Sequence, residues 1–157
     1  MKNIKLFLMS IGVLSTVLSC SDDDGNDNGG FSVEALVGTW DLVEVKLSSA
    51  VDLDGDGQSS DNLLDEEDCI SGTIIFNADT TYKYEQSSFT ISFITNDQYY
   101  VACSGTNLAT GAWGSDGNEV AFQGSSTLGV LQLSNNTIIK NVGDDLPGVL
   151  SYVYLKR

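Results

Sequence analysis

Three aspartates at alternate positions carry the strongest chemical signal in this sequence: Asp52, Asp54 and Asp56. Gly55 lies between the second and the third aspartate and Gly57 follows the third, and glycine allows the chain to bend sharply. This spacing brings three carboxylates to one side of a tight turn. It suits Ca²⁺, which takes about six to eight hard oxygen ligands in proteins. The segment is therefore a candidate calcium site.

The remaining ligands of such a site have to come from the residues that follow. Gln58 offers its backbone carbonyl oxygen. At the position where an EF-hand has its bidentate Glu, this sequence has Leu63, so a helix-loop-helix calcium site is not expected. An irregular loop would instead bring Asp61, Asp65 or Glu66 to the ion. A solvated acidic turn that holds no metal is the alternative.

The N-terminal residues have the order of a secretory signal, with two lysines, a mostly apolar stretch (residues 6–18) and Ser19 before Cys20. The apolar stretch is shorter than the ~20 residues that a membrane-spanning helix needs. The segment Val17-Leu18-Ser19-Cys20 resembles a lipobox, the cleavage site of bacterial lipoproteins. The resemblance implies that residues 1–19 are removed and that lipid on Cys20 anchors the chain to a membrane. A plain secretory signal with an incidental cysteine is the alternative.

Residues 20–30 are predicted to be a flexible linker. After Cys20 this segment has four aspartates and no apolar residue, so it has nothing to bury. The acidic run also resembles the surface-export signal of Gram-negative bacteria that display lipoproteins outward. That resemblance implies an outer-membrane lipoprotein exposed at the cell surface, whereas the alternative is that the run is only a spacer.

The two other cysteines, Cys69 and Cys103, are expected to form a disulfide, because leftover cysteines in an oxidising envelope usually pair. Cys69 lies at the end of the acidic segment, residues 48–70, and Cys103 ends a predicted strand. Such a bond would tie the far end of the acidic segment to the wall of the domain. Two separate buried thiols are the alternative.

Charge and composition exclude several classes of function. The formal net charge is −15 and becomes −17 without residues 1–19, so nucleic acid and anionic membrane surfaces are not expected partners. The chain has no histidine, which excludes imidazole catalysis and most catalytic zinc sites. We therefore expect a protein that is not an enzyme. The sequence leaves the oligomeric state open.

Residues 31–157 are predicted to form one all-β domain, because short β-prone runs alternate with turn residues. In 89–93, apolar and polar residues alternate, which indicates one buried and one solvated face. Turns are expected at 77–79, 115–118 and 134–136, and Ser32 is the N-cap of a possible helix at 32–37. The candidate strands are 37–47, 72–76, 80–84, 89–94, 98–103, 108–113, 119–122, 128–133, 137–142 and 149–155.

The residues at the two ends of this domain resemble the sequence pattern of lipocalins. Gly38-Thr39-Trp40 heads the first predicted strand, and Lys156-Arg157 ends the last. The resemblance implies that Trp40 closes the barrel floor and that a basic side chain stacks across it, an interaction of ~1–2 kcal/mol. Residues 73–82 and 111–113 further resemble lipocalin-like domains of bacterial lipoproteins, although the other full lipocalin motifs are absent. The expected fold is an antiparallel meander that closes into a lipocalin-like up-and-down β-barrel of about 8 to 10 strands.

A barrel of this kind implies that the domain binds a small apolar ligand. The connection 48–70 would cover the open mouth of the barrel as a calcium-binding or acidic lid, since so long a loop is usually functional or disordered. The alternative is a structural or interaction module on the cell surface, in which aromatic side chains only fill the barrel. The candidate lining residues are drawn from Tyr82, Tyr84, Phe89, Phe93, Tyr99, Tyr100, Trp113 and Phe122.

Overall fold

A computed structural model of the chain describes residues 32–93, 99–134, 136–142 and 148–157. The expected leader, the lipidated Cys20 and the acidic linker lie outside these ranges. The described residues form helices α1 (Val33–Leu36) and α2 (Leu63–Glu66) and strands β1 (Gly38–Val51), β2 (Ser60–Asn62), β3 (Gly72–Phe76), β4 (Thr81–Phe93), β5 (Tyr99–Ser115), β6 (Glu119–Gln123), β7 (Val130–Ser134), β8 (Thr137–Asn141) and β9 (Val149–Lys156).

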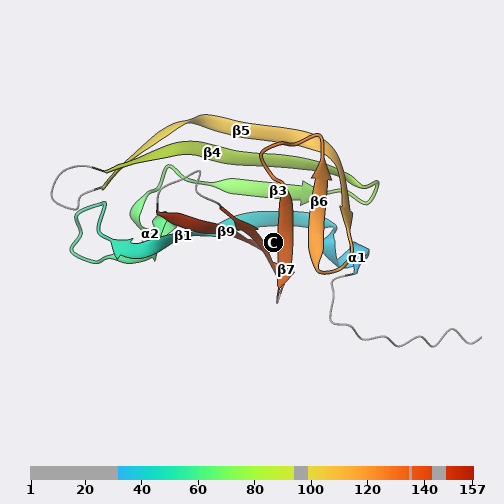
Figure 1. Ribbon diagram of the computed structural model, residues 1–157, viewed down its shortest axis with the longest axis horizontal. Coiled ribbons are helices and arrows are strands. Elements are labelled where there is room, and N and C mark those ends of the chain that lie inside the picture. The colour runs from blue at the N-terminus through green and yellow to red at the C-terminus, as the bar shows by residue number, and fades with distance from the viewer. Residues whose placement is uncertain (1–31, 94–98, 135, 143–147) are drawn as a thin grey trace, which may run out of the picture.

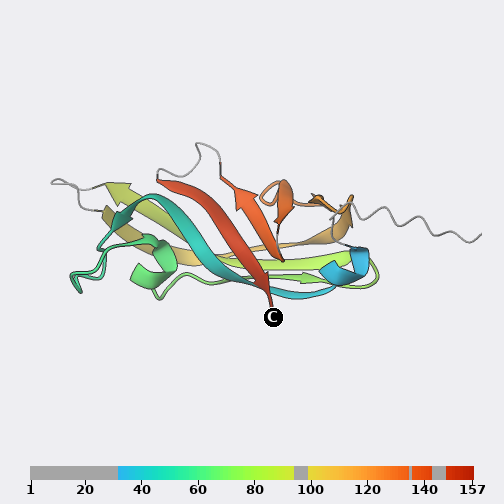
Figure 2. The ribbon, with the colours of Figure 1, turned by 90° about the horizontal axis from the view of Figure 1, so that it is seen from below.

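The strands form one antiparallel meander that closes on itself (Figures 1 and 2). From β3 to β9 each strand pairs with the next, β1 pairs with β3, and β1 also pairs with β9 to close the ring. Eight strands thus make a closed barrel, and β2 is an extra strand on β1. The predicted all-β fold is confirmed, and the architecture fits a lipocalin-like fold.

Two of the strands are longer than their sequence patterns indicate. The expected strands 80–84 and 89–94 are joined in β4, and 98–103 and 108–113 are joined in β5. The strand pairing continues through polar residues of the types that are common in turns, with Gln86 opposite Asn107 and Ser87 opposite Thr106. A register shift between Ser87 and Phe89 marks a bulge, which breaks the alternation of side chains without ending the strand.

The core lies inside the barrel, where alternate residues of the strands point inward. In the first half of β4, Tyr82, Tyr84 and Gln86 are buried, whereas Lys83 and Glu85 between them are exposed. The same period places Tyr154 of β9 in the core at 0% exposure. Its hydroxyl donates a hydrogen bond to Oε1 of Gln86, so one of the few buried polar side chains is satisfied.

Helix α1 closes one end of the barrel through Trp40 of β1. The indole is 0% exposed, and its Nε1 donates a hydrogen bond of 2.8 Å to the carbonyl oxygen of Leu36. Phe76 meets the indole edge-on at 6.5 Å between ring centroids. Nζ of Lys156 lies 6.0 Å from the centroid of the Trp40 ring and donates to the carbonyl oxygen of Ala35 at 2.7 Å. The indole therefore links the first helix and the first strand to the last strand.

The two basic residues expected at this floor have different partners. Lys156 lies over Trp40, whereas Arg157 donates two hydrogen bonds of 2.8 Å to the carboxylate of Asp41. Gly38 makes room for the lysine, because a Cβ at this position would lie only 2.9 Å from Cε of Lys156. Its φ of +136° is also one that residues with a side chain rarely adopt.

We predict that alkaline pH destabilises the barrel through its buried phenols. Burial raises the pKa of Tyr84 to about 12, and the neighbouring Tyr154 hydroxyl acts in the opposite direction. The folded state thus holds this proton more tightly than the unfolded chain, whose Tyr pKa is about 10. The stabilisation is complete below pH 10 and is lost as the pH rises, by about 2 kcal/mol at pH 12 for this one group.

Denaturant unfolding of the chain at several pH values, from about 9 to about 12, measures this loss. The matched variant is Tyr84→Phe, which removes the hydroxyl and keeps the ring in the core. It should weaken the alkaline loss of stability by about 2 kcal/mol at pH 12. The same pH dependence in the variant and the wild type would contradict the prediction.

Candidate metal centre

The acidic segment lies against β1 and is more regular than the sequence indicates. An irregular connection was expected over residues 48–70, but β1 extends to Val51, and both β2 and α2 fall within the segment. The side chain of Asn62 explains this order, because its Oδ1 accepts hydrogen bonds from the backbone N–H of Val45 at 3.0 Å and of Leu64 at 3.2 Å. It fixes the segment to β1 and caps the N-terminus of α2 at the same time.

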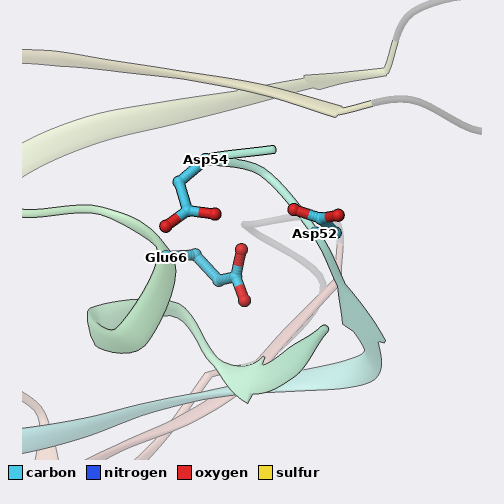
Figure 3. Close-up of side chains that lie close together, drawn as sticks. All are labelled: Asp52, Asp54 and Glu66. Atoms are coloured by element: carbon cyan, nitrogen blue, oxygen red, sulfur yellow. The ribbon is translucent and has the colours of Figure 1, made fainter. Parts of the chain in front are cut away.

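Three carboxylates come together in this segment (Figure 3). Oxygens of Asp52, Asp54 and Glu66 all lie within 4.8 Å of one another. The two aspartates are exposed, whereas Glu66 is only 7% exposed. Figure 3 shows the carboxylate groups of Asp54 and Glu66 directed toward each other, with Asp52 opposite them. The arrangement thus brings together three carboxylate oxygens, one from each residue.

Backbone hydrogen bonds hold these carboxylates in place. Asp52 accepts from the N–H groups of Gly55 at 2.9 Å and Gly57 at 3.1 Å, both of which have positive φ. Glu66 accepts from the N–H groups of Leu53 at 2.7 Å and Ser60 at 2.9 Å. A carboxylate has about four lone-pair directions, so each of these groups keeps the capacity to bind a cation.

No basic side chain neutralises the cluster within the part of the chain that the structure describes. The nearest lysine in sequence, Lys46, forms its ion pairs with Asp61 and Glu44 instead. Three negative charges within a few ångströms, one of them on a buried group, repel one another strongly. A divalent cation would remove this repulsion.

The other expected ligands have different partners. Asp56 accepts hydrogen bonds from the backbone N–H of Gln58 at 2.7 Å and from its side-chain amide at 3.2 Å. Asp61 is bound by Lys46. Asp65 accepts from the hydroxyl of Ser60 at 2.7 Å. The structure thus brings together Asp52, Asp54 and Glu66, and it leaves the carboxylates of Asp56, Asp61 and Asp65 outside the cluster.

A small apolar pocket lies beside the acidic segment at this end of the barrel. Its volume is ≈ 20 Å³, which is about the room that one water molecule needs. Leu53 lines it from the acidic segment and Leu63 from α2, while Ile91 lines it from β4. Ligand pockets for small molecules usually measure about 300–1,000 Å³, so a ligand would have to displace this segment.

The aromatic residues proposed as ligand contacts have different positions. Tyr82, Tyr84, Phe89 and Trp113 are buried, at 7% exposure or less, and they pack in the core cluster. Tyr100 is 58% exposed, so its assignment to the barrel lining is wrong. It lies opposite Ser92 on β4, on the outer face, where alternation along the strand directs it away from Val101 and the core. Nothing is described of the side chain of Phe93.

The disulfide between Cys69 and Cys103 is confirmed, with 6.2 Å between the two Cα atoms. Cys69 follows α2, and Cys103 lies in β5. The bond thus joins the end of the acidic segment to a strand that is not its neighbour in the sheet.

Comparisons with known proteins give a family and no closer relative. Residues 18–137 match a family model described as a domain of unknown function, DUF5004. No curated protein and no solved structure matches the chain. Among the described helices, none is long and apolar enough to cross a membrane.

Proposed function

This chain belongs to the DUF5004 family, and we propose that it is a non-enzymatic binding module of the bacterial cell envelope whose barrel mouth is ordered by Ca²⁺. The cluster of Asp52, Asp54 and Glu66 carries this proposal, because their oxygens lie within 4.8 Å of one another. Two of these residues belong to the alternating aspartates that favour calcium in the sequence. The third returns to them from helix α2.

Calcium fits this cluster better than other common metals. The candidate ligands are all carboxylates, and hard oxygen ligands suit Ca²⁺ and Mg²⁺ rather than zinc or copper. The chain has no histidine, and Cys69 and Cys103 are joined in a disulfide. Mg²⁺ demands a near-ideal octahedron and keeps most of its water, whereas Ca²⁺ accepts an irregular shell from flexible loops.

The cation would also fix the roof of the apolar pocket. Leu53 lies between Asp52 and Asp54, and Leu63 begins the helix that carries Glu66; both leucines line the pocket. Glu66 already links the two ends of the loop 53–60, because its carboxylate accepts hydrogen bonds from the N–H groups of Leu53 and Ser60. With calcium bound, the roof would be rigid. Without it, the segment would loosen and the pocket could open to a small apolar ligand.

Calorimetric titration of the purified chain with CaCl₂ tests the metal site. We expect binding by the wild type, and added stability of ~2.7 kcal/mol when free Ca²⁺ exceeds the dissociation constant a hundredfold. Asp54→Asn should weaken binding about tenfold or more, because calcium affinity follows the charge of the ligands. Asp54 suits this test because it is exposed, and because an asparagine can also accept the hydrogen bond that Asp54 accepts from the backbone N–H of Asp56.

Glu119→Gln is the matched control, since it removes one exposed carboxylate from β6 and should leave binding unchanged. Titration with MgCl₂ separates calcium binding from a general attraction of cations by an acidic protein. A wild type that gives no heat of binding up to millimolar calcium would exclude the site. Equal affinities of the wild type and Asp54→Asn would exclude these ligands.

The proposal includes an anchor at Cys20 and a small apolar ligand in the barrel mouth. The anchor is supported by the lipobox-like sequence, which implies an outer-membrane lipoprotein with residues 20–30 as its tether. A native mass spectrum of the chain purified from its own host tests both parts. We expect loss of residues 1–19, added mass from diacylglycerol and an acyl chain, and a bound small molecule. A mass equal to the uncleaved polypeptide would contradict the anchor.

The packed interior favours a second candidate function, a surface interaction module. The described residues fill the barrel with large side chains, and the mouth pocket has room for about one water molecule. In that case binding would use the outside of the barrel. A host-purified chain that retains no small molecule in the native spectrum would favour this function over the carrier.

A further inference from the structure

One long strand edge of the barrel has no strand paired with it among the described residues. Strand β5 pairs with β4 along most of its length, but only residues 112–115 of β5 pair with β6. From Tyr100 to Ala109 the second edge therefore carries backbone N–H and C=O groups with no described strand paired to them, whereas the backbone of Gln123 and Gly124 lies against residues 110–111. Figure 1 shows β5 along the margin of the molecule, with β6 approaching only one of its ends.

This edge lacks the features that usually protect exposed strands. Natural edges carry charged side chains, especially lysine, or proline, which prevent another strand from adding to them. No residue of β5 is charged and none is proline, although the chain has 29 charged residues. Tyr100 and Leu108 are 58% and 67% exposed on this strand. The edge thus combines open hydrogen-bonding groups with exposed apolar side chains.

We propose that this edge is a dimerisation surface, at which β5 of one copy pairs antiparallel with β5 of a second copy of the chain. Antiparallel pairing of identical strands is self-complementary and follows from a two-fold axis. The chain has a formal net charge of −15, so two copies repel one another overall. They can meet at β5 without placing carboxylates face to face.

The bulge in β5 fixes where the axis lies. The register with β4 shifts between Thr106 and Cys103, and Gly105 has a φ of +76°, so Ser104 and Gly105 interrupt the regular ladder. With the two-fold axis at Ser104, both interruptions face each other. The regular stretches on either side then pair with those of the second copy. In this register Tyr100 of each copy lies opposite Leu108 of the other, and aromatic and aliphatic cross-strand pairs are stabilising.

A groove beside the edge fits this arrangement. It has a volume of ≈ 350 Å³ and is lined by Leu108, Ala109 and Thr110 of β5 and by residues 124–127. In the proposed register, Tyr100 of the second copy lies over this groove. The lining includes Leu108, which can pack against the ring, and the hydroxyls of Ser125 and Ser126, which can bond the phenol. The surface thus has a place for the largest side chain of its own edge.

Native mass spectrometry of the full chain over a range of concentrations, from detergent if the chain carries lipid, tests the proposal. The wild type should give a dimer whose fraction rises with concentration. Leu108→Lys places a charge on the edge, and Tyr100→Ala removes the side chain that fills the groove. Each should raise the dissociation constant of the dimer by about tenfold or more. Both positions are exposed, so thermal unfolding should remain close to that of the wild type.

Leu150→Lys is the matched control, because Leu150 is a similarly exposed leucine, at 52%, on β9. This variant should dimerise as the wild type does, which shows that the effect of Leu108→Lys belongs to β5 and not to any added surface lysine. Association through lipid chains would leave the dimer intact in all three variants. A wild type that stays monomeric at every concentration would overturn the proposal. A dimer that survives both Leu108→Lys and Tyr100→Ala would overturn it as well. The outcome does not depend on calcium, which binds a different part of the chain in the function proposed above.

Discussion

Replacing both Cys69 and Cys103 with serine is expected to lower the free energy of unfolding by about 4 kcal/mol. The disulfide spans 34 residues, and cross-linking a chain over that distance removes much of the freedom of its unfolded state. Both cysteines are exposed, so serine creates no buried cavity and no buried hydroxyl. The loss therefore measures the cross-link rather than a packing defect.

The same double variant should also weaken calcium binding. Cys69 follows α2, the helix that supplies Glu66, and the bond to β5 restrains the end of that segment. A looser segment must be ordered when the cation binds, which costs free energy. Denaturant unfolding and calcium titration of the variant measure the two effects.

The wild type treated with a reducing agent is the control for this variant. It should lose the same stability, provided that reduction is complete, because the two proteins then lack the same bond. A loss below about 1 kcal/mol in both would show that the unfolded chain is already restricted between these residues. Such a result would remove the stabilising role of the disulfide.

Trp40→Ala is expected to cost about 3–5 kcal/mol of stability, the usual loss for a large buried aromatic side chain. Trp40 is 0% exposed and packs edge-on against Phe76. Its removal leaves a cavity at the barrel floor, and the carbonyl oxygen of Leu36 loses the indole N–H that donates a hydrogen bond to it. It also removes the ring beneath the ammonium group of Lys156. Thermal and denaturant unfolding measure the loss.

Two further variants separate the contributions of this residue. Trp40→Phe keeps an aromatic ring but loses the indole N–H, so it should cost less, about 1–3 kcal/mol for the unpaired carbonyl and the smaller ring. Val43→Ala on the same strand is the control, because Val43 is 43% exposed and its truncation should have little effect. If Trp40→Ala proved no more destabilising than Val43→Ala, the proposed role of the indole in closing the floor would fail.

The course of the strands could be predicted from the sequence, because alternation and turn residues are local signals. The strand at 72–76 has the predicted bounds, and the helix at Ser32 has the predicted N-cap. The joining of β4 was not predictable, since a polar stretch such as Ser87 and Ser88 is equally typical of a turn. Only the hydrogen bonds to β5 decide between the two, and these are long-range contacts.

The carboxylate cluster shows the same limit of local reasoning. The spacing of Asp52 and Asp54 indicates a turn lined with carboxylates, but the third member depends on a helix that the sequence pattern does not reveal. Asn62 caps α2 and attaches it to β1, and this brings Glu66 back over Leu53. Asp61 and Asp65 are close to Glu66 in sequence, yet they point to Lys46 and Ser60. The direction of α2 therefore decides which of these acidic residues completes the cluster.

The pairing of β1 with β9 has a consequence for how the barrel forms. Asp41 and Arg157, which bond each other across this seam, are 116 residues apart in the chain. Contacts between such distant residues slow folding, because a long loop must close before any of them stabilises the structure. The ring therefore cannot close until β9, the last strand in the sequence order, has been made and has reached β1.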